Sequence, residues 1–306
     1  MKFAVAMPGT NHMPSTPAWS HELSARDARA VVATIDAAGY DTITTSEHLG
    51  MPHFEVPRLG PWWVHCLSQM AFIAGASERV RIDSTVLVLP YHHPLALAKA
   101  LSTIDQLSGG RLNISVGVGH AVREFAVLGV PFEERGRRTD EIIEAMKVLW
   151  SEAEPVFEGE FYSIEGLAFE PKPVQQPRPP IMVGGNSKPA LRRAARHEGW
   201  QPNPTDFTLA DLPPLLDYLR SQPEYAAKED TFDIFWLSGV PDLPSLSFGS
   251  SSESERAAFG DAVLEGVARL VPHGITRTSL PRVDTTSVGE FQEFLQWFAR
   301  EVAPRT

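Results

Sequence analysis

The sequence predicts an α/β protein in which eight strands alternate with eight helices, a (β/α)8 TIM barrel formed as one domain by residues 1–306. Two observations lead to this prediction. Short apolar runs that end in turn residues alternate along the chain with longer segments whose apolar residues recur at helical spacing. About eight such units fill 306 residues, which is an ordinary size for this barrel. A doubly wound open sheet is the alternative fold.

The first half of the chain supplies four strand-helix units. The predicted strands cover residues 2–6, 40–46, 81–89 and 111–119. The predicted helices run from Ser24 to Gly39, over 62–77, over 94–107, and from the segment "ERGRRTDE" through Trp150. In the first helix, apolar residues recur at helical spacing until Gly39, which is a typical helix C-terminal residue.

Residues 152–180 interrupt this alternation with short alternating runs, glycine and many prolines. We expect a surface hairpin there, inserted between the fourth helix and the fifth strand. The remaining predicted strands cover residues 180–185, 198–204, 232–239 and 274–281, and the remaining predicted helices cover 188–197, 208–220, 255–270 and 287–302.

Composition limits the classes of function. A formal net charge of -11 disfavours nucleic-acid binding, which requires a basic surface. Cys66 is the only cysteine, which excludes an internal disulfide and a thiolate metal site. The apolar run before Pro8 is too short for a secretory signal, and no apolar run is long enough to span a membrane. We therefore expect a cytoplasmic protein that acts on a small molecule.

The ends of the second and third strands carry polar residues, at the face where barrel enzymes place their chemistry. Glu47 and His48 end the second strand, either as site residues or as solvated turn residues. His92 and His93 follow the third strand, but no further ligands occur at a spacing that predicts a metal site. We interpret them instead as part of a loop before a helix that begins at Pro94.

The fourth strand ends in "SVGVGH", with Gly117, Gly119 and His120. Glycine weakens a strand, so its repetition requires a compensating reason. One reason is that glycine at a barrel mouth allows a planar ligand to approach the main chain. The other is close packing against an adjacent helix.

The fifth strand leads into a helix whose first turn resembles an anion-binding site. The helix opens after Gly184, Gly185, Asn186 and Ser187. Free amides at a helix N-terminus attract anions, and Lys188, Arg192 and Arg196 add a basic stripe at i, i+4 and i+8. The alternative is an exposed cationic face on which Ser187 is an ordinary N-cap. The pair Trp62 and Trp63 is assigned no role.

Four stretches together resemble a known family. They are "SEHL", "STVLVLPYHHPLALAKALSTIDQLSGGRLNISVGVGH", "REFAVLGVPFEERGRRTDEIIEAMKVLW" and "PPIMVGGNSKPALRRAARHEGW". Their content and order closely resemble the luciferase-like monooxygenase superfamily, and within it the actinobacterial branch that uses the deazaflavin coenzyme F420. The resemblance covers residues 1–200 and is loose beyond 205.

The resemblance implies catalytic and coenzyme-binding roles at the strand ends. Glu47 and His48 match the acid-histidine pair of the family, with the histidine near the reactive ring of the coenzyme. Ser84 and Thr85, with Val86 as the alternative register, match a non-proline cis peptide bond that supports the deazaflavin.

Two further segments match coenzyme contacts of the family. Gly117 and Gly119 match its G-x-G, which contacts the ring system. The phosphate loop corresponds to Gly184, Gly185, Asn186 and Ser187, and Lys188 is expected at the phosphate or the anionic tail.

Two departures limit the resemblance to the sugar-phosphate dehydrogenases of the family. An acidic proton donor after the G-x-G is replaced by His120, and a tryptophan four residues after the histidine is replaced by Pro52. Sugar-phosphate oxidation is therefore not expected. His120 either takes over proton transfer or shapes the pocket.

The expected function is that of an oxidoreductase that transfers a hydride between coenzyme F420 and a small organic substrate. An FMN-dependent monooxygenase of the same fold and a non-catalytic protein that binds a flavin or deazaflavin are the alternatives. A metal-dependent hydrolase is a more distant one. Barrels of this family often pair, so a homodimer is a further expectation.

Overall fold

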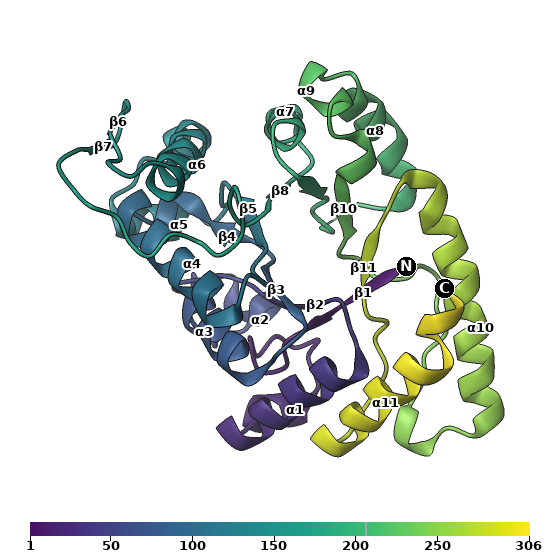
Figure 1. Ribbon diagram of the computed structural model, residues 1–306. Helices are drawn as coiled ribbons and strands as arrows, with labels where there is room; N and C mark the ends of the chain where they lie inside the picture. Colours follow the sequence, from purple (N-terminus) through teal and green to yellow (C-terminus); the bar gives the residue numbers. More distant parts are fainter. Residues whose placement is uncertain (206) are drawn as a thin grey trace.

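Parallel strands occupy the centre of the structure, and helices lie around them (Figure 1). The structure is a computed structural model that describes residues 1–205 and 207–306. The strands of the barrel are β1 (Lys2–Ala6), β2 (Thr42–Thr45), β3 (Arg81–Ser84), β4 (Leu87–Val88), β5 (Ile114–Gly117), β8 (Ile181–Gly184), β9 (Gly199–Gln201), β10 (Asp233–Trp236) and β11 (Arg277–Ser279). They are joined in the order β3-β2-β1-β11-β10-β9-β8-β5-β4, and every neighbouring pair is parallel.

The sheet closes on itself between its two ends. β3 and β4 are two parts of one predicted strand, 81–89, and β4 pairs with β5. At the base of the same strand, Ile82 forms a parallel bridge with Leu112, and the Asn113 amide donates to the Ile82 carbonyl at 2.7 Å. Counting β3 and β4 together gives eight barrel strands, so the predicted (β/α)8 barrel is confirmed and the open sheet is wrong.

One helix follows each barrel strand. These helices are α1 (Ala25–Ala38), α3 (Cys66–Ala76), α4 (Pro94–Ser108), α6 (Arg135–Ser151), α7 (Lys188–Ala195), α8 (Leu212–Arg220), α10 (Glu253–Leu270) and α11 (Val288–Glu301). The Ser24 hydroxyl caps α1, and Gly39 ends it with a φ of 81°. The helix predicted over 62–77 begins only at Cys66, because His65 caps it and the segment before it is not helical.

Shorter elements lie in the connections. They are α2 (Val56–Leu59), α5 (Val122–Leu128), α9 (Pro223–Ala226) and the 3-10 turns Ala18–Glu22, Leu89–Tyr91, Phe132–Glu134, Leu209–Asp211, Glu229–Thr231, Phe248–Ser250, Val271–His273 and Ala303–Arg305. Between α6 and β8, strand β6 (Phe157–Glu158) pairs antiparallel with β7 (Ser163–Ile164). In Figure 1 this pair lies at the upper left, away from the strands of the barrel.

The barrel interior holds a small apolar layer above a buried group of ions. Ala4, Met182 and Phe235 pack together as a cluster separate from the main core between strands and helices. Below them, near the amino ends of the strands, Arg277 is 1% exposed and pairs with Asp83 at 3.2 Å and with Asp233.

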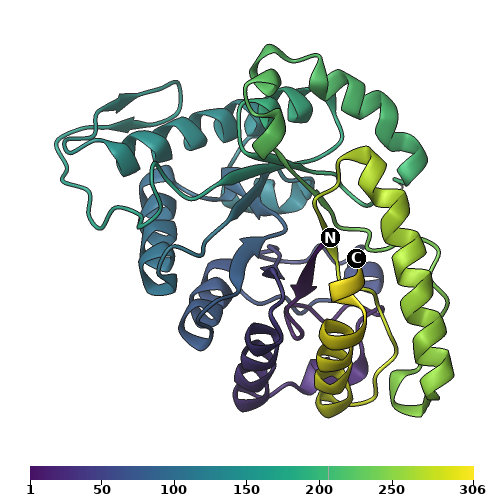
Figure 2. The same cartoon turned by 45° about the vertical axis from the view of Figure 1, so that its right-hand side comes forward.

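The two termini lie side by side in both views (Figure 2). The amino group of Met1 donates to the carbonyl of Thr306 at 3.3 Å. No helix in the described part of the chain is long and apolar enough to cross a membrane.

Candidate active site

Glu47 lies at the carboxyl end of β2, and both of its carboxylate oxygens have hydrogen-bond partners within the protein. The residue is 4% exposed, and its carboxylate accepts a hydrogen bond from the Val88 amide at 2.7 Å. Its other oxygen lies 2.9 Å from Nε2 of His92. Glu47 therefore ties the end of β2 to the segment after β4. The acid-base role predicted for Glu47 stays a prediction.

The two neighbouring histidines after β4 also have structural partners. His92 pairs with Glu47, and Nδ1 of His93 accepts from the Leu95 amide at the start of α4. Within residues 1–205 and 207–306, no three His, Cys, Asp or Glu side chains are grouped to hold a metal ion.

His48 is held by a carboxylate that the sequence analysis did not identify. Its Nδ1 lies 2.9 Å from Oε2 of Glu124, and its ring packs edge-on against Trp63 with centroids 4.6 Å apart. An ionised carboxylate only accepts hydrogen bonds, so Nδ1 of His48 is the donor. The other nitrogen, Nε2, is therefore the one that can exchange a proton with a bound molecule.

Glu124 lies in α5 and is saturated with donors. One oxygen accepts from the amides of Leu49 and Gly50 at 2.6 and 3.1 Å, and the other also accepts from the Tyr91 hydroxyl at 3.1 Å. Burial alone would favour the neutral acid, but the hydrogen bonds from His48, Gly50 and Leu49 outweigh it and lower the pKa of Glu124. Glu124 is thus an anion held in a fixed position, hydrogen-bonded to the imidazole of His48.

His120 stands next to His48 at the end of β5. The two rings meet edge-on with centroids 5.7 Å apart. The surrounding protein and the neighbouring His48 lower the pKa of His120. Because the ordinary pKa of histidine already lies below neutrality, His120 is uncharged at pH 7. A neutral ring can accept a proton or a hydrogen bond.

A cavity of about 330 Å³ opens beside these two rings, a size within the range of small-molecule sites. It lies between the segment after β2 and helix α5. Apart from the two histidines, Glu55 and Arg123, its lining is Met51, Pro52, Phe54, Leu59, Ala121, Val122 and Ala126. Pro52 thus lines the cavity, while Trp63 from a later segment supplies the ring that contacts His48.

The glycines at the ends of β5 and β8 make room for Val86. A Cβ added to Gly117 would lie 2.6 Å from one methyl group of Val86, and one added to Gly184 would lie 2.8 Å from the other. The peptide bond between Thr85 and Val86 is cis, one residue later than Ser84–Thr85. Gly119 has a φ of 79° and lies against Val88. The protein itself therefore requires these glycines, with or without a planar ligand.

Substituting Gly117 with alanine is expected to destabilise the protein by about 1–3 kcal/mol, as overpacked core sites typically do. The added methyl group would meet Val86, so the double variant G117A/V86A should recover most of the loss. Thermal unfolding of wild type, both single variants and the double variant measures this.

Gly75→Ala is the matched control, because no atom lies within 4 Å of its added Cβ and its place in α3 suits alanine. If the unfolding temperature of G117A/V86A falls by the sum of the two decreases seen in the single variants, Val86 is not the group that constrains Gly117.

The predicted phosphate loop after β8 is tied to the next loop. Both polar atoms of the Asn186 side chain bond to the Asn203 backbone, at 2.9 and 2.8 Å. Ser187 caps α7 by accepting from the Ala190 amide, and Gly185 has a φ of 113°. Asn186 therefore shapes the loop, and its role in binding a phosphate stays a prediction.

The basic stripe on α7 is not continuous. The Lys188 ammonium lies 5.2 Å from the centre of the Tyr218 ring, and Arg192 donates to the Tyr218 hydroxyl at 2.9 Å. Arg196 instead pairs with Asp140 at 2.7 Å, a carboxylate that also pairs with Arg193 at 2.8 Å. Lys188 and Arg192 thus share Tyr218 as a partner and Arg196 does not, and the anion-binding role expected of this helix stays a prediction.

An unpaired amide lies at the carboxyl end of β9. Gln201 is 1% exposed, and neither Nε2 nor Oε1 has a hydrogen-bond partner among the described residues. Gly199 faces Met182 inside the barrel, so strand alternation also directs Gln201 inward. Gln201 is the register partner of Gly184. A donor and an acceptor are thus left over at the mouth, matching the adjacent N–H and C=O groups of a flavin or deazaflavin ring edge.

A barrel with a carboxylate-held histidine, an apolar cavity and an unpaired amide at the carboxyl ends of its strands has the architecture of a TIM-barrel enzyme. Residues 1–234 match the luciferase-like monooxygenase family, and the chain belongs to this family. Its members include oxidoreductases and monooxygenases that use a flavin or deazaflavin with small molecules.

Known proteins similar to this chain include two curated relatives. An uncharacterized Mycobacterium tuberculosis protein is 32% identical over 216 residues, covering 66% of this chain and 73% of that protein. The FMNH2-dependent dimethylsulfone monooxygenase of Pseudomonas putida is 35% identical over 157 residues, covering 44% of this chain and 43% of that protein.

Two solved structures share the fold over nearly the whole chain. The monooxygenase RslO1 of Streptomyces bottropensis superimposes with a TM-score of 0.79 at 21% identity, covering 99% of both chains. An F420-dependent secondary alcohol dehydrogenase, in complex with an F420-acetone adduct, superimposes with a TM-score of 0.69 at 15% identity, covering 100% of this chain and 99% of that one.

Proposed function

We propose that this protein transfers a hydride between coenzyme F420 and a small organic alcohol or carbonyl compound. The observation that carries the proposal is the His48–Glu124 pair beside a mostly apolar cavity. Interconversion of an alcohol and a carbonyl compound transfers both a hydride and a proton. A histidine held by a carboxylate can accept or donate that proton as a general base or acid. The fold shared with an F420-dependent alcohol dehydrogenase supports this choice.

The residues at the barrel mouth fit a deazaflavin. Gln201 offers the unpaired donor and acceptor for its ring edge, and the ring would contact Gly117, Gly119 and Val86, which packs against Gly117 and Gly184. The phosphate and the anionic tail would meet the backbone amides between Gly184 and Ser187, together with Lys188. Ser84 donates to the Ser115 carbonyl at 2.8 Å, so its role is to hold the strand end in place.

A bound deazaflavin would supply the carbon that accepts or returns the hydride. Nε2 of His48 would accept the hydroxyl proton when an alcohol is converted into a carbonyl compound. The Glu124 anion stabilises the imidazolium that forms. In the reverse direction, the same nitrogen returns the proton to the carbonyl oxygen. Met51, Phe54 and Leu59 would supply apolar contacts for the carbon part of the substrate.

A second candidate function is that of an FMN-dependent monooxygenase. The relative that favours it is the FMNH2-dependent dimethylsulfone monooxygenase, at 35% identity. Because FMN has the same ring edge and carries a phosphate, the residues named for the deazaflavin would serve FMN as well. The two candidates therefore differ in which coenzyme binds more tightly.

A fluorescence titration of the purified protein with coenzyme F420 and with FMN, each oxidised and reduced, separates these candidates. We expect F420 to bind more tightly. Gln201→Leu is expected to weaken that binding by about tenfold, because the ring edge would lose its hydrogen bonds. Gln292→Leu, whose amide contacts α1 on the outer surface, is the matched control. Preference for FMN would favour the monooxygenase, and binding of neither would overturn both candidates.

A further inference from the structure

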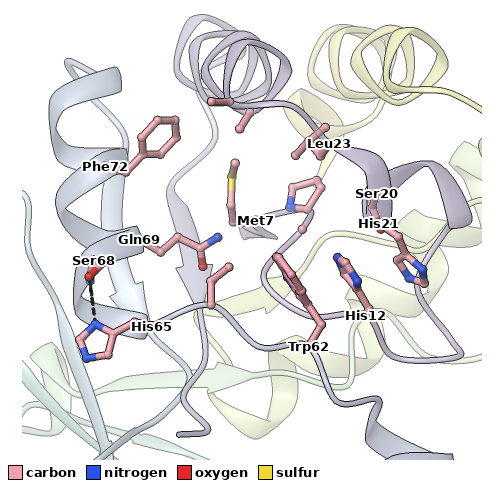
Figure 3. Close-up of a pocket in the computed structure, with 15 residues that line it drawn as sticks. Met7, His12, Ser20, His21, Leu23, Trp62, His65, Ser68, Gln69 and Phe72 are labelled. Atoms are coloured by element: carbon pink, nitrogen blue, oxygen red, sulfur yellow. Dashed lines mark hydrogen bonds between the residues drawn. The ribbon is translucent and has the colours of Figure 1, made fainter. Parts of the chain in front are cut away.

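A second cavity lies outside the barrel mouth, and we call it the lateral cavity (Figure 3). It opens between α1, α3 and the segment after β1, and its volume is also about 330 Å³. The residues that matter here are Met7, His12, Leu23, Trp62, Gln69 and Phe72. It shares no lining residue with the cavity beside His48, so it is a separate site.

Two paired segments form the wall between the two cavities. Asn11 forms an antiparallel bridge with Trp63, and the His12 amide donates to the Trp62 carbonyl at 3.1 Å. Neighbouring residues of an extended segment point to opposite faces. Accordingly, Trp62 lines the lateral cavity, whereas Trp63 packs against His48. The lateral cavity is therefore adjacent to the candidate active site without being part of it.

Three flat rings are stacked along one side of the lateral cavity. Trp62 and His12 are nearly parallel, with centroids 4.7 Å apart, and His12 stacks on His21 at 4.4 Å. Figure 3 shows Trp62 on the cavity side of His12 and His21 beyond it. The face of the Trp62 ring that points away from His12 is therefore open, and the residue is 54% exposed. An open indole face is a stacking surface for a flat aromatic group.

Gln69 presents a hydrogen-bond donor opposite this ring. Its Oε1 accepts from the Thr45 hydroxyl, and it also lies 2.9 Å from the Thr10 hydroxyl, which shares its proton with the Met7 carbonyl at 2.7 Å. These bonds orient the amide, and Nε2 has no hydrogen-bond partner among the described residues. In Figure 3 the amide nitrogen points into the lateral cavity, toward Met7. A ligand that stacks on Trp62 would complete the hydrogen bonding of Gln69 by offering an acceptor.

The lining of the lateral cavity lacks the residues that are always ionised at neutral pH. Its described residues include no Asp, Glu, Lys or Arg. Burial and the neighbouring His21 lower the pKa of His12, which is therefore neutral at pH 7. Met7, Leu23 and Phe72 complete the apolar part of the surface. An ionised ligand would lose hydration here without gaining a counter-charge, so a neutral one is favoured.

We propose that the lateral cavity binds an uncharged, flat aromatic molecule with a carbonyl oxygen. The aromatic ring stacks on Trp62, and the carbonyl oxygen accepts a hydrogen bond from Nε2 of Gln69. This site is independent of the coenzyme and of the reaction at His48.

The test uses 2-acetylnaphthalene as the probe and the full chain without coenzyme. Isothermal titration calorimetry is expected to show one probe bound per chain. Trp62→Ala should weaken binding by about tenfold, because it removes the stacking surface. Phe54→Ala is the matched control, because it removes an exposed ring from the cavity beside His48. It should leave the affinity for the probe unchanged.

A second variant tests the hydrogen bond. Gln69→Glu keeps oxygen acceptors for Thr10 and Thr45 but replaces the donor with an anion that repels a carbonyl oxygen. We expect it to lower the affinity for 2-acetylnaphthalene by about tenfold. The affinity for naphthalene, which has no carbonyl group, should change less than twofold. Circular dichroism confirms that each variant is folded.

Three results would overturn the proposal. The first is the absence of probe binding to folded wild-type protein. The second is binding that Phe54→Ala abolishes and Trp62→Ala preserves, which would place the probe at the barrel mouth. The third is a dimer, observed by analytical ultracentrifugation, that Trp62→Ala dissociates, because a second copy of the chain would then occupy the lateral cavity.

Discussion

His48→Asn is expected to lower kcat by about 10²- to 10⁴-fold, the usual loss when a general acid-base group is removed. The asparagine amide nitrogen can take the place of Nδ1 and still donate to Glu124, so the variant removes mainly the proton-exchanging Nε2. The measurement is steady-state reduction of coenzyme F420 with a secondary alcohol that the wild-type protein oxidises.

The role of Glu124 is tested in the same assay. Glu124→Gln is expected to lower kcat in the wild-type background, because an amide can either donate or accept and no longer fixes the proton on Nδ1 of His48. In the His48→Asn background the same change should have little further effect, since both residues act as one unit.

Glu141→Gln is the matched control for Glu124→Gln. Glu141 is also a carboxylate that accepts from backbone amides, those of Glu160, Phe161 and Tyr162, but it lies beside the β6–β7 pair. Its substitution should leave kcat unchanged. Full additivity of His48→Asn and Glu124→Gln would show that Glu124 does not act through His48.

Arg277→Met is expected to destabilise the protein by about 3–5 kcal/mol, because it leaves the buried carboxylate of Asp83 without its counter-charge. Arg277 is 1% exposed and pairs with Asp83 and Asp233 inside the barrel. Thermal unfolding measures the loss. Arg300→Met is the matched control, because its ion pair with Glu301 lies on the surface and should contribute little.

The loss on Arg277→Met should depend on pH. Burial, only partly opposed by Arg277, raises the pKa of Asp83 from 3.8 to about 6. The contribution of Asp83 to stability is therefore complete below about pH 4 and is lost as the pH rises through about 6. Without Arg277 the buried charge is uncompensated, so the variant should lose more stability at pH 8 than at pH 5. An equal loss at both values would mean that Asp83 is not the group responsible.

Signals close together in the chain were sufficient to predict the barrel. In α1, helical apolar spacing, the Ser24 cap and Gly39 determine both ends within a few residues. The alternation of strands and helices then leaves few ways to arrange them. The start of α3 was missed, because the cap at His65 is not a residue type that usually signals one.

Position at a strand end predicts that His48 and His120 lie at the barrel mouth, but it does not predict which residues contact them. Glu124 lies 76 residues from His48 in a short helix without a clear apolar period, so no local pattern connects them. The sequence also predicts that the glycines of "SVGVGH" are there for a specific reason, but the contact that requires Gly117 comes from Val86, which lies between β3 and β4.

The sequence by itself therefore determined the order and type of the elements, because caps, turns and apolar period act between residues near each other in the chain. Only the tertiary structure decided which side chains meet at the mouth. Closing the barrel brings the carboxyl ends of β2, β5 and β9 together at the mouth. Glu124 is thereby hydrogen-bonded to His48, and the side-chain amide of Gln201 has no partner among the described residues. These contacts depend on strand register and closure, which no short stretch of sequence records.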